Sequence, residues 1–319
     1  MARLLITRPL PERVLAEARA LADVTARDST APMSEAEMVQ ALRDYDAILP
    51  TLGDLFSAEI FARVPEPRTR LLANFGMGYS HIDTGAARAA GIAVSNTPGA
   101  VTDATADIAL TLMLMSCRRA GEGDRLVRSG KWEGWHPTQM LGLHMSGKRL
   151  GVVGMGRIGK AIARRGHHGF GMEVGFFNRS QVSDPGVPAR QVPALIELAG
   201  WADVLVVAVP ASPATRHLIG AEVLAAMQPH AHLVNIGRGD VVDEAALIAA
   251  LQAGRIGGAG LDVYEHEPEV PAALRGLENV TLLPHLGTAA LEVREAMGLV
   301  AVENIRAHLA GAPPPNVVN

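Results

Sequence analysis

The chain has 319 residues, 48% hydrophobic and 19% charged, which is enough apolar material for a globular core and more chain than one core usually organises. We therefore expect two domains. The chain has 29 basic and 33 acidic residues, so it has no excess of positive charge to neutralise a phosphate backbone. A nucleic-acid partner is therefore not expected. No apolar run is long enough for a signal peptide or a membrane span, so we expect a cytoplasmic protein with no membrane partner.

Short apolar runs bounded by Gly, Pro, Asn or Asp alternate with amphipathic helical stretches, a pattern typical of parallel βα units in an α/β fold. The first strands are predicted at residues 4–7, 47–50, 71–74 and 92–95. A long helix over about 102–129 leads to six more strands, at 150–154, 173–178, 204–209, 232–236, 258–263 and 280–283. A last helix, 289–309, is expected to return to the first unit. The single cysteine, Cys117, lies in a mostly apolar run and is expected to be a buried small hydrophobe.

A glycine-rich turn joins the strand at 150–153 to a helix that begins near residue 160. In Gly154-Met155-Gly156-Arg157-Ile158-Gly159 the first glycine permits a tight turn, the second lets the backbone approach a pyrophosphate, and the third allows close helix packing. The free N–H groups of the helix would face the phosphates. A turn without a ligand is the alternative, but the strand before it and the helix after it favour a dinucleotide site. Val209 and Pro210, at another strand end, are expected to line the nicotinamide half.

Three polar residues follow the last three predicted strands: Arg238, Glu267 and His285. Reduction of a 2-oxo acid needs a cation for the carboxylate, a hydride donor and an acid for the developing alkoxide. Glu267 beside His285 would favour the charged imidazolium and raise its pKa. Taken singly, a glycine-flanked Arg is often a turn residue and a Glu before Pro is often a solvated loop residue. Together with a dinucleotide loop, the three predict a dehydrogenase, and this chemistry needs no metal ion.

These motifs occur in the order and spacing of the D-isomer-specific 2-hydroxyacid dehydrogenases, and the chain resembles that family over essentially its whole length. The resemblance implies two Rossmann-like doubly wound domains with a cleft between them. The substrate-binding domain would comprise residues 1–99 and 288–319, and the dinucleotide-binding domain residues 100–287. It further implies that Arg238 binds the substrate carboxylate and carbonyl, that His285 is the acid/base supported by Glu267, and that Asp262 helps to position the cofactor.

The same resemblance extends to a substrate loop at residues 74–83, in which the amides of Met77 and Gly78 would bind an anion and His81 would be structural. Leu52 resembles a selectivity contact, and Thr105 resembles a cofactor contact, although a threonine on the helix surface is an equal alternative. The expected cofactor contacts are Thr105, Gly154, Gly156, Arg157, Ile158, Gly159, Asn178, Arg179, Ser180, Val209, Pro210, Ile236, Asp262 and Gly287. The expected substrate contacts are Leu52, Met77, Gly78, Trp135, Arg238 and His285.

Segments 95–99, 129–137 and 169–172 resemble the glyoxylate/hydroxypyruvate reductase branch, which implies a homodimer acting on a small 2-oxo acid such as glyoxylate or hydroxypyruvate. Trp135 would reach the partner's substrate pocket and Trp132 would be a core residue; both could instead pack the dimer contact. A formate dehydrogenase would resemble this chain with Gln in place of Glu267. A dinucleotide-sensing binding protein of the same fold is a further alternative, but the chain carries no appended tail for that role.

The cofactor preference depends on the end of the strand at 173–178. A site specific for NAD places a carboxylate there for the ribose 2′-hydroxyl, whereas this chain has Asn178, Arg179 and Ser180. Arg179 can bind a 2′-phosphate through charge-assisted hydrogen bonds and Ser180 adds a neutral donor. We therefore expect NADPH (NADP) to be preferred, with NAD as a usable alternative. Arg179 could also simply point to solvent.

Overall fold

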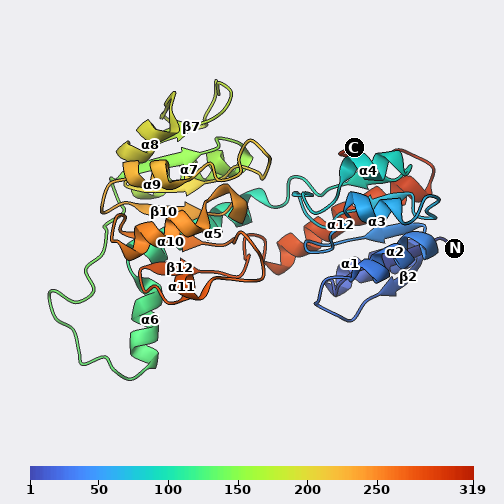
Figure 1. The fold of residues 1–319 in the computed structure, drawn as a ribbon, viewed down its shortest axis with the longest axis horizontal. Helices are drawn as coiled ribbons and strands as arrows, with labels where there is room; N and C mark the ends of the chain where they lie inside the picture. The colour runs from blue at the N-terminus through green and yellow to red at the C-terminus, as the bar shows by residue number, and fades with distance from the viewer. The chain divides into compact units, whose positions relative to one another are not determined.

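The computed structural model describes all 319 residues, which divide into two compact units. Unit 1 comprises Met1–Val101 and Ala289–Asn319, and unit 2 comprises Thr102–Thr288. Each unit is a parallel sheet with helices between its strands (Figure 1). The α/β class expected from the alternating pattern is confirmed, with a doubly wound sheet in each unit. No helix of either unit combines the length and the apolar character needed to cross a membrane.

Unit 1 contains five parallel strands in the order β2-β1-β3-β4-β5. The strands are β1 (Arg3–Ile6), β2 (Asp23–Ala26), β3 (Ala47–Leu49), β4 (Leu71–Ala73) and β5 (Ala93–Ser95). The helices are α1 (Glu12–Leu21), α2 (Glu35–Asp44), α3 (Ala58–Ala62), α4 (Thr84–Ala89) and α12 (Leu291–Leu309). The edge strand β2 was not predicted, because it buries none of its four residues and so lacks an apolar run.

Unit 2 contains seven parallel strands in the order β12-β11-β10-β9-β6-β7-β8. The strands are β6 (Arg149–Val153), β7 (Glu173–Phe177), β8 (Ala189–Gln191), β9 (Val204–Val207), β10 (His232–Asn235), β11 (Gly258–Leu261) and β12 (Val280–Leu282). The helices are α5 (Thr102–Cys117), α6 (Ala120–Arg128), α7 (Arg157–Phe170), α8 (Leu195–Trp201), α9 (Ala221–Ala226), α10 (Glu244–Gln252) and α11 (Ala272–Arg275), with a 3₁₀ turn η1 (Gly239–Val241). The prediction of six strands was one short, because the edge strand β8 has no buried residue.

The single long helix predicted over 102–129 is wrong, because the chain breaks between α5 and α6. Arg119 takes a left-handed backbone conformation with φ 52° and forms two hydrogen bonds to Glu122, while the Cys117 carbonyl accepts the amide of Leu143 at 2.7 Å. These contacts end the first helix and start the second. Helix α6 and the segment after it consequently extend away from the sheet of unit 2 (Figure 1).

The order of strands in unit 2 reverses direction between β6 and β9, and this switch point is where open α/β sheets bind ligands. Val153, at the end of β6, is paired with Val207 of β9 on one side and with Phe177 of β7 on the other. The segments that follow these three strands therefore begin side by side at the carboxyl edge. The sequence places the glycine-rich turn in one of them and Asn178 in another.

Candidate active site

The glycine-rich turn connects β6 to α7 at the switch point, as predicted. Gly154 has φ 97°, a conformation that favours glycine, and a Cβ there would lie 2.6 Å from Val209 Cγ1. A Cβ on Gly159 would lie 2.1 Å from the Gly154 carbonyl oxygen. Both glycines are thus required by packing within the protein.

Gly156 differs from the other two glycines of the turn, because a Cβ there would meet no atom within 4 Å. It is exposed, its backbone is extended, and it caps α7 without any side-chain hydrogen bond to the first turn. Free N–H groups at a helix N-terminus next to open space are the arrangement that receives a pyrophosphate. The turn therefore fits a bound dinucleotide at Gly156, Arg157 and Ile158.

Asn178 follows β7 and joins its end to the glycine-rich turn. Its Oδ1 accepts the Met155 amide at 3.2 Å and its Nδ2 donates to the Ser180 carbonyl at 2.9 Å. Asn178 occupies the position at which NAD-specific sites have a carboxylate, and its side chain is hydrogen-bonded to the loop. Arg179 and Ser180 follow it in the chain and are exposed.

Arg238 lies in the segment after β10, where the backbone is closely packed on both sides. A Cβ on Gly237 would lie 2.6 Å from the Val209 carbonyl oxygen, and one on Gly239 would overlap the carbonyl of Tyr264. The Arg238 guanidinium donates to the Gly237 carbonyl at 2.7 Å. Burial lowers the pKa of Arg238, opposed by the charges of Glu267 and Asp240, yet a guanidinium stays protonated at any physiological pH. The result is a largely buried cation without a carboxylate in contact, which suits an anionic ligand.

Glu267 and His285 form the pair that their strand-end positions predicted. His285 Nδ1 lies 2.8 Å from Glu267 Oε2, and both side chains are about one-third exposed. Burial raises the pKa of Glu267, but the hydrogen bond and charge of His285, the Tyr264 amide and the charge of Arg238 outweigh it and hold this pKa below its usual value. Glu267 is therefore ionised at neutral pH and accepts the Nδ1 proton, which leaves Nε2 of His285 for chemistry.

The backbone around His285 is held by Asp262 and Thr105. His285 has φ 54°, and its amide donates to the Asp262 carbonyl at 2.9 Å. The Asp262 carboxylate is 1% exposed and accepts the amides of Leu286 at 2.6 Å and Gly287 at 2.8 Å. The Thr105 hydroxyl donates to the Gly287 carbonyl at 3.2 Å. Thr105 is buried, so the alternative of a helix-surface threonine is wrong; it and Asp262 hold the histidine loop.

In unit 1 the predicted substrate loop follows β4, and its carbonyl groups are bound by side chains that the sequence analysis did not single out. Asn74 Nδ2 donates to the carbonyls of Gly76 and Gly78 at 3.0 Å each, and Asn96 Nδ2 donates to that of Met77 at 2.9 Å. The sequence could have indicated Asn74 and Asn96, since each directly follows a strand of the same parallel sheet. These bonds hold the carbonyl groups of residues 76–78, the segment that contains Met77 and Gly78.

Leu52 and His81, two further residues considered in the sequence analysis, also lie in unit 1. Leu52 is 38% exposed in the loop after β3, where its carbonyl accepts Arg8 Nη1 and the fully buried Asp54 accepts the amide of Thr51. His81 is buried, at 8% exposure.

The prediction that Trp132 is a core residue is wrong. Trp132 is 50% exposed and Trp135 is 79% exposed, because residues 131–140 form no helix and do not pack into the core of unit 2.

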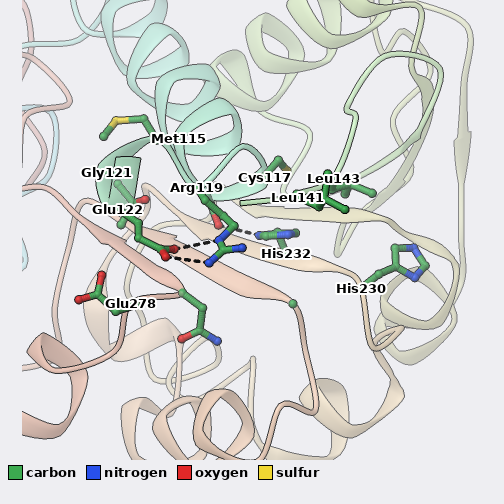
Figure 2. Close-up of a pocket in the computed structure, with 15 residues that line it drawn as sticks. Met115, Cys117, Arg119, Gly121, Glu122, Leu141, Leu143, His230, His232 and Glu278 are labelled. Atoms are coloured by element: carbon green, nitrogen blue, oxygen red, sulfur yellow. Dashed lines mark hydrogen bonds and ion pairs between the residues drawn. The ribbon is translucent and has the colours of Figure 1, made fainter. Parts of the chain in front are cut away.

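Cys117 is fully buried, as predicted, and burial raises the pKa of its thiol to about 12, so it is unreactive. It lines a cavity of about 530 Å³ (Figure 2). Because His232 of the lining begins β10, this cavity lies at the amino-terminal edge of the sheet, whereas Arg238 and His285 follow the carboxyl ends of β10 and β12.

The chain is similar to known proteins over nearly its whole length. Residues 110–287 match the sequence model of the D-isomer specific 2-hydroxyacid dehydrogenase NAD binding domain. The chain is 42% identical to a glyoxylate reductase of Korarchaeum cryptofilum, over 99% of its own length and 96% of that protein. It is 37% identical to a glycerate dehydrogenase of Hyphomicrobium methylovorum, over 97% of each chain.

A solved structure extends the likeness to three dimensions. An NADPH-dependent glyoxylate/hydroxypyruvate reductase from Sinorhizobium meliloti, in complex with NADP and malonate, superposes with a TM-score of 0.88 at 35% identity, covering 99% of this chain and 96% of that one. The chain therefore belongs to the D-isomer specific 2-hydroxyacid dehydrogenase family, in the branch of the glyoxylate and hydroxypyruvate reductases.

Proposed function

We propose that this protein reduces a small 2-oxo acid, glyoxylate or hydroxypyruvate, to the 2-hydroxy acid, with D stereochemistry where the product is chiral. The observation that carries the proposal is the Glu267–His285 hydrogen bond of 2.8 Å near a partly buried arginine, Arg238, that contacts no carboxylate. A cation and an acid at one edge of the sheet suit the carboxylate that a 2-oxo acid carries and the negative charge that develops on its carbonyl oxygen during reduction. The glyoxylate and hydroxypyruvate reductases among the relatives support this substrate class.

Arg238 is the proposed carboxylate ligand. Its planar guanidinium presents parallel N–H donors that can bind both oxygens of a carboxylate, and burial strengthens the attraction. The same cation polarises the neighbouring carbonyl toward the alkoxide. Met77, Gly78 and Leu52 of unit 1 are the proposed additional substrate contacts, with the two amides binding the anion and Leu52 limiting the size of the side chain.

His285 is the proposed acid. With Nδ1 held by Glu267, the imidazolium would donate its Nε2 proton to the carbonyl oxygen and leave a neutral ring whose Nδ1–H still pairs with the carboxylate. The bound nicotinamide supplies the hydride that reduces the carbonyl carbon. In the reverse direction neutral His285 would accept the hydroxyl proton at Nε2.

The proposed cofactor site follows from the switch point of unit 2. Gly154, Gly156, Arg157, Ile158 and Gly159 would bind the pyrophosphate, and Val209, Pro210, Ile236 and Gly287 would line the nicotinamide half. Thr105 and Asp262 would act on the cofactor through the loop at Gly287 that they hold. The match to an NAD binding domain supports a nicotinamide dinucleotide.

We further propose a preference for NADPH. Asn178 carries no charge to repel a 2′-phosphate, and Arg179 and Ser180 are exposed beside the turn with donors available. A relative that is described as NADPH-dependent supports the same preference.

The proposed assembly is a homodimer built through the face that carries α6 and the segment after it. Five of the twelve exposed large hydrophobic side chains of the protein lie between residues 114 and 141, which comprise the end of α5, helix α6 and the segment after it, a concentration typical of an interface. They are Leu114, Val127, Trp132, Trp135 and Leu141. Sedimentation should give a dimer, and Trp135→Ala should change the ranking of substrates more than the affinity for cofactor. A fully active monomer would contradict the assembly.

The decisive experiment is a panel of glyoxylate, hydroxypyruvate, pyruvate and phenylpyruvate, each assayed with NADPH and with NADH. We expect the highest kcat/KM with glyoxylate or hydroxypyruvate, and D-glycerate as the product of hydroxypyruvate. No oxidation of NADPH or NADH with any of the four acids would refute the proposed function.

A further inference from the structure

A second histidine–carboxylate pair lies at the same sheet edge as the catalytic pair. His217 Nε2 is 2.8 Å from Glu265 Oε1, and the Glu265 side chain is 13% exposed. His217 follows β9 and has φ 52°, a left-handed conformation that is uncommon for residues other than glycine. A residue held in an uncommon backbone conformation by a partly buried hydrogen bond is a common feature of functional sites.

The backbone of the His217 segment is bonded to the segment that follows Arg238. The His217 amide donates to the Asp240 carbonyl at 2.8 Å, and the Ile219 amide donates to the Val241 carbonyl at 3.0 Å. The Asp243 amide returns a bond to the Ile219 carbonyl at 3.1 Å. The position of the His217 backbone is therefore set by the arginine segment.

The side chain of His217 is bonded to the segment that carries Glu267. Glu265 is two residues before Glu267, and the amide of Tyr264 donates to Glu267 Oε1 at 3.1 Å. A movement of residues 264–265 would thus displace the carboxylate that holds His285. His217 is thus bonded through its main chain to the segment that follows Arg238, and through its ring to Glu265 in the segment that carries Glu267.

We propose that His217 is a positioning residue for the reaction of Arg238 and His285, acting through Glu265. The proposal rests on the function proposed above, in which the arginine binds the carboxylate while the histidine protonates the neighbouring oxygen. Both contacts must be made on one small substrate, so the spacing of the two side chains matters most in the transition state. A misplacement of about 1 Å can cost on the order of 100-fold in rate.

Two substitutions at His217 separate this role from a structural one. His217→Asn suits the left-handed backbone but is too short to reach Glu265, whereas His217→Gln places an amide nitrogen as far along the side chain as Nε2. His217→Asn should lower kcat by about 10-fold or more and change the substrate KM by less than about 3-fold, because ground-state binding by Arg238 survives. His217→Gln should restore kcat to within about 3-fold of the unmodified enzyme.

Arg216→Ala is the matched control. Arg216 is the neighbouring residue and lies 3.5 Å from the same Glu265 oxygen, but it is 63% exposed, so its removal takes away a nearby charge without the short bond. It should leave kcat within about 2-fold of the unmodified enzyme. Glu265→Ala combined with His217→Asn should cost no more than the worse single variant, because both remove the same contact.

The outcomes distinguish this inference from the proposed function. An unmodified protein inactive on every 2-oxo acid would refute the function itself. An active protein in which His217→Asn keeps its kcat would overturn the positioning role. Equal losses in His217→Asn and His217→Gln, or equal losses in His217→Asn and Arg216→Ala, would overturn it as well. NADPH binding and the urea midpoint of unfolding, measured on each variant, should stay at the values of the unmodified protein.

Discussion

His232 should make the stability of unit 2 depend on pH in a way that a single substitution removes. The ring is 7% exposed at the start of β10, where Nδ1 lies 2.7 Å from Ser116 Oγ (Figure 2). Gly258 gives the ring its space, since a Cβ there would be 2.9 Å from Nδ1. Burial, with a smaller contribution from the charge of His230, lowers the pKa of His232 to about 4.

Stability decreases with falling pH because the unfolded chain binds a proton on His232 more readily than the folded chain does. The unfolded chain takes up a proton on this histidine near pH 6.5 and the folded chain only near pH 4, so stability falls as pH drops between these values and the loss is complete below pH 4. The change from 6.5 to about 4 corresponds to a loss of stability on the order of 3 kcal/mol, most of which has occurred by pH 4.5.

Urea unfolding at pH 7.5 and pH 4.5 measures this effect in the unmodified protein and in His232→Gln. All three tryptophans lie in unit 2, and Trp201 packs against the core of that unit, so a change in fluorescence on unfolding reports on unit 2. His232→Gln should lose roughly 2–3 kcal/mol less than the unmodified protein between the two pH values, because Gln does not titrate. His168→Gln, at an exposed position of the same unit, is the control and should follow the unmodified protein. The same pH dependence in His232→Gln as in the unmodified protein would refute the reasoning.

His285→Ala and Arg238→Ala should each lower reductase turnover at least ~100-fold while cofactor binding survives, because general acid catalysis alone contributes on that order. Normal turnover in either variant would exclude that residue from the mechanism. Gly156→Ala should match the unmodified protein in urea unfolding yet bind the dinucleotide more weakly, whereas Gly159→Ala should destabilise unit 2 by roughly 1–3 kcal/mol through overpacking. Undiminished affinity in Gly156→Ala, by fluorescence titration with NADPH, would contradict the pyrophosphate site. Arg179→Ala should raise the KM for NADPH by at least ~10-fold and leave NADH little changed, since a charge-assisted hydrogen bond contributes about 1.5–3 kcal/mol. Equal kcat/KM for both cofactors in the unmodified protein would refute the NADPH preference.

Local patterns were sufficient to locate the central strands and the glycine-rich turn. A strand buried on both faces is a continuous apolar run, and a turn with φ 97° at Gly154 requires glycine, so both leave a signal within a few residues of sequence. The pairing of Glu267 with His285 was also predictable, because residues that follow strands of one parallel sheet gather at one edge.

Features that depend on contacts between distant segments were not predictable. The edge strands β2 and β8 bury no residue and leave no apolar run to detect. The break between α5 and α6 depends on Leu143 binding the Cys117 carbonyl, and Trp132 is exposed because its segment leaves the core. Helical periodicity records which residues are apolar and carries no information about these partners.

Several roles were assigned only by the tertiary structure. Thr105 and Gly287 are 182 residues apart, yet one hydrogen bond makes the threonine a support for the histidine loop. His217 and Glu265 are 48 residues apart and gave no joint pattern, although each follows a strand end. The sequence by itself determined which residue types stand at the carboxyl edge of the sheet. Which of them touch one another was decided by the folding of loops whose hydrogen bonds join residues far apart in the chain.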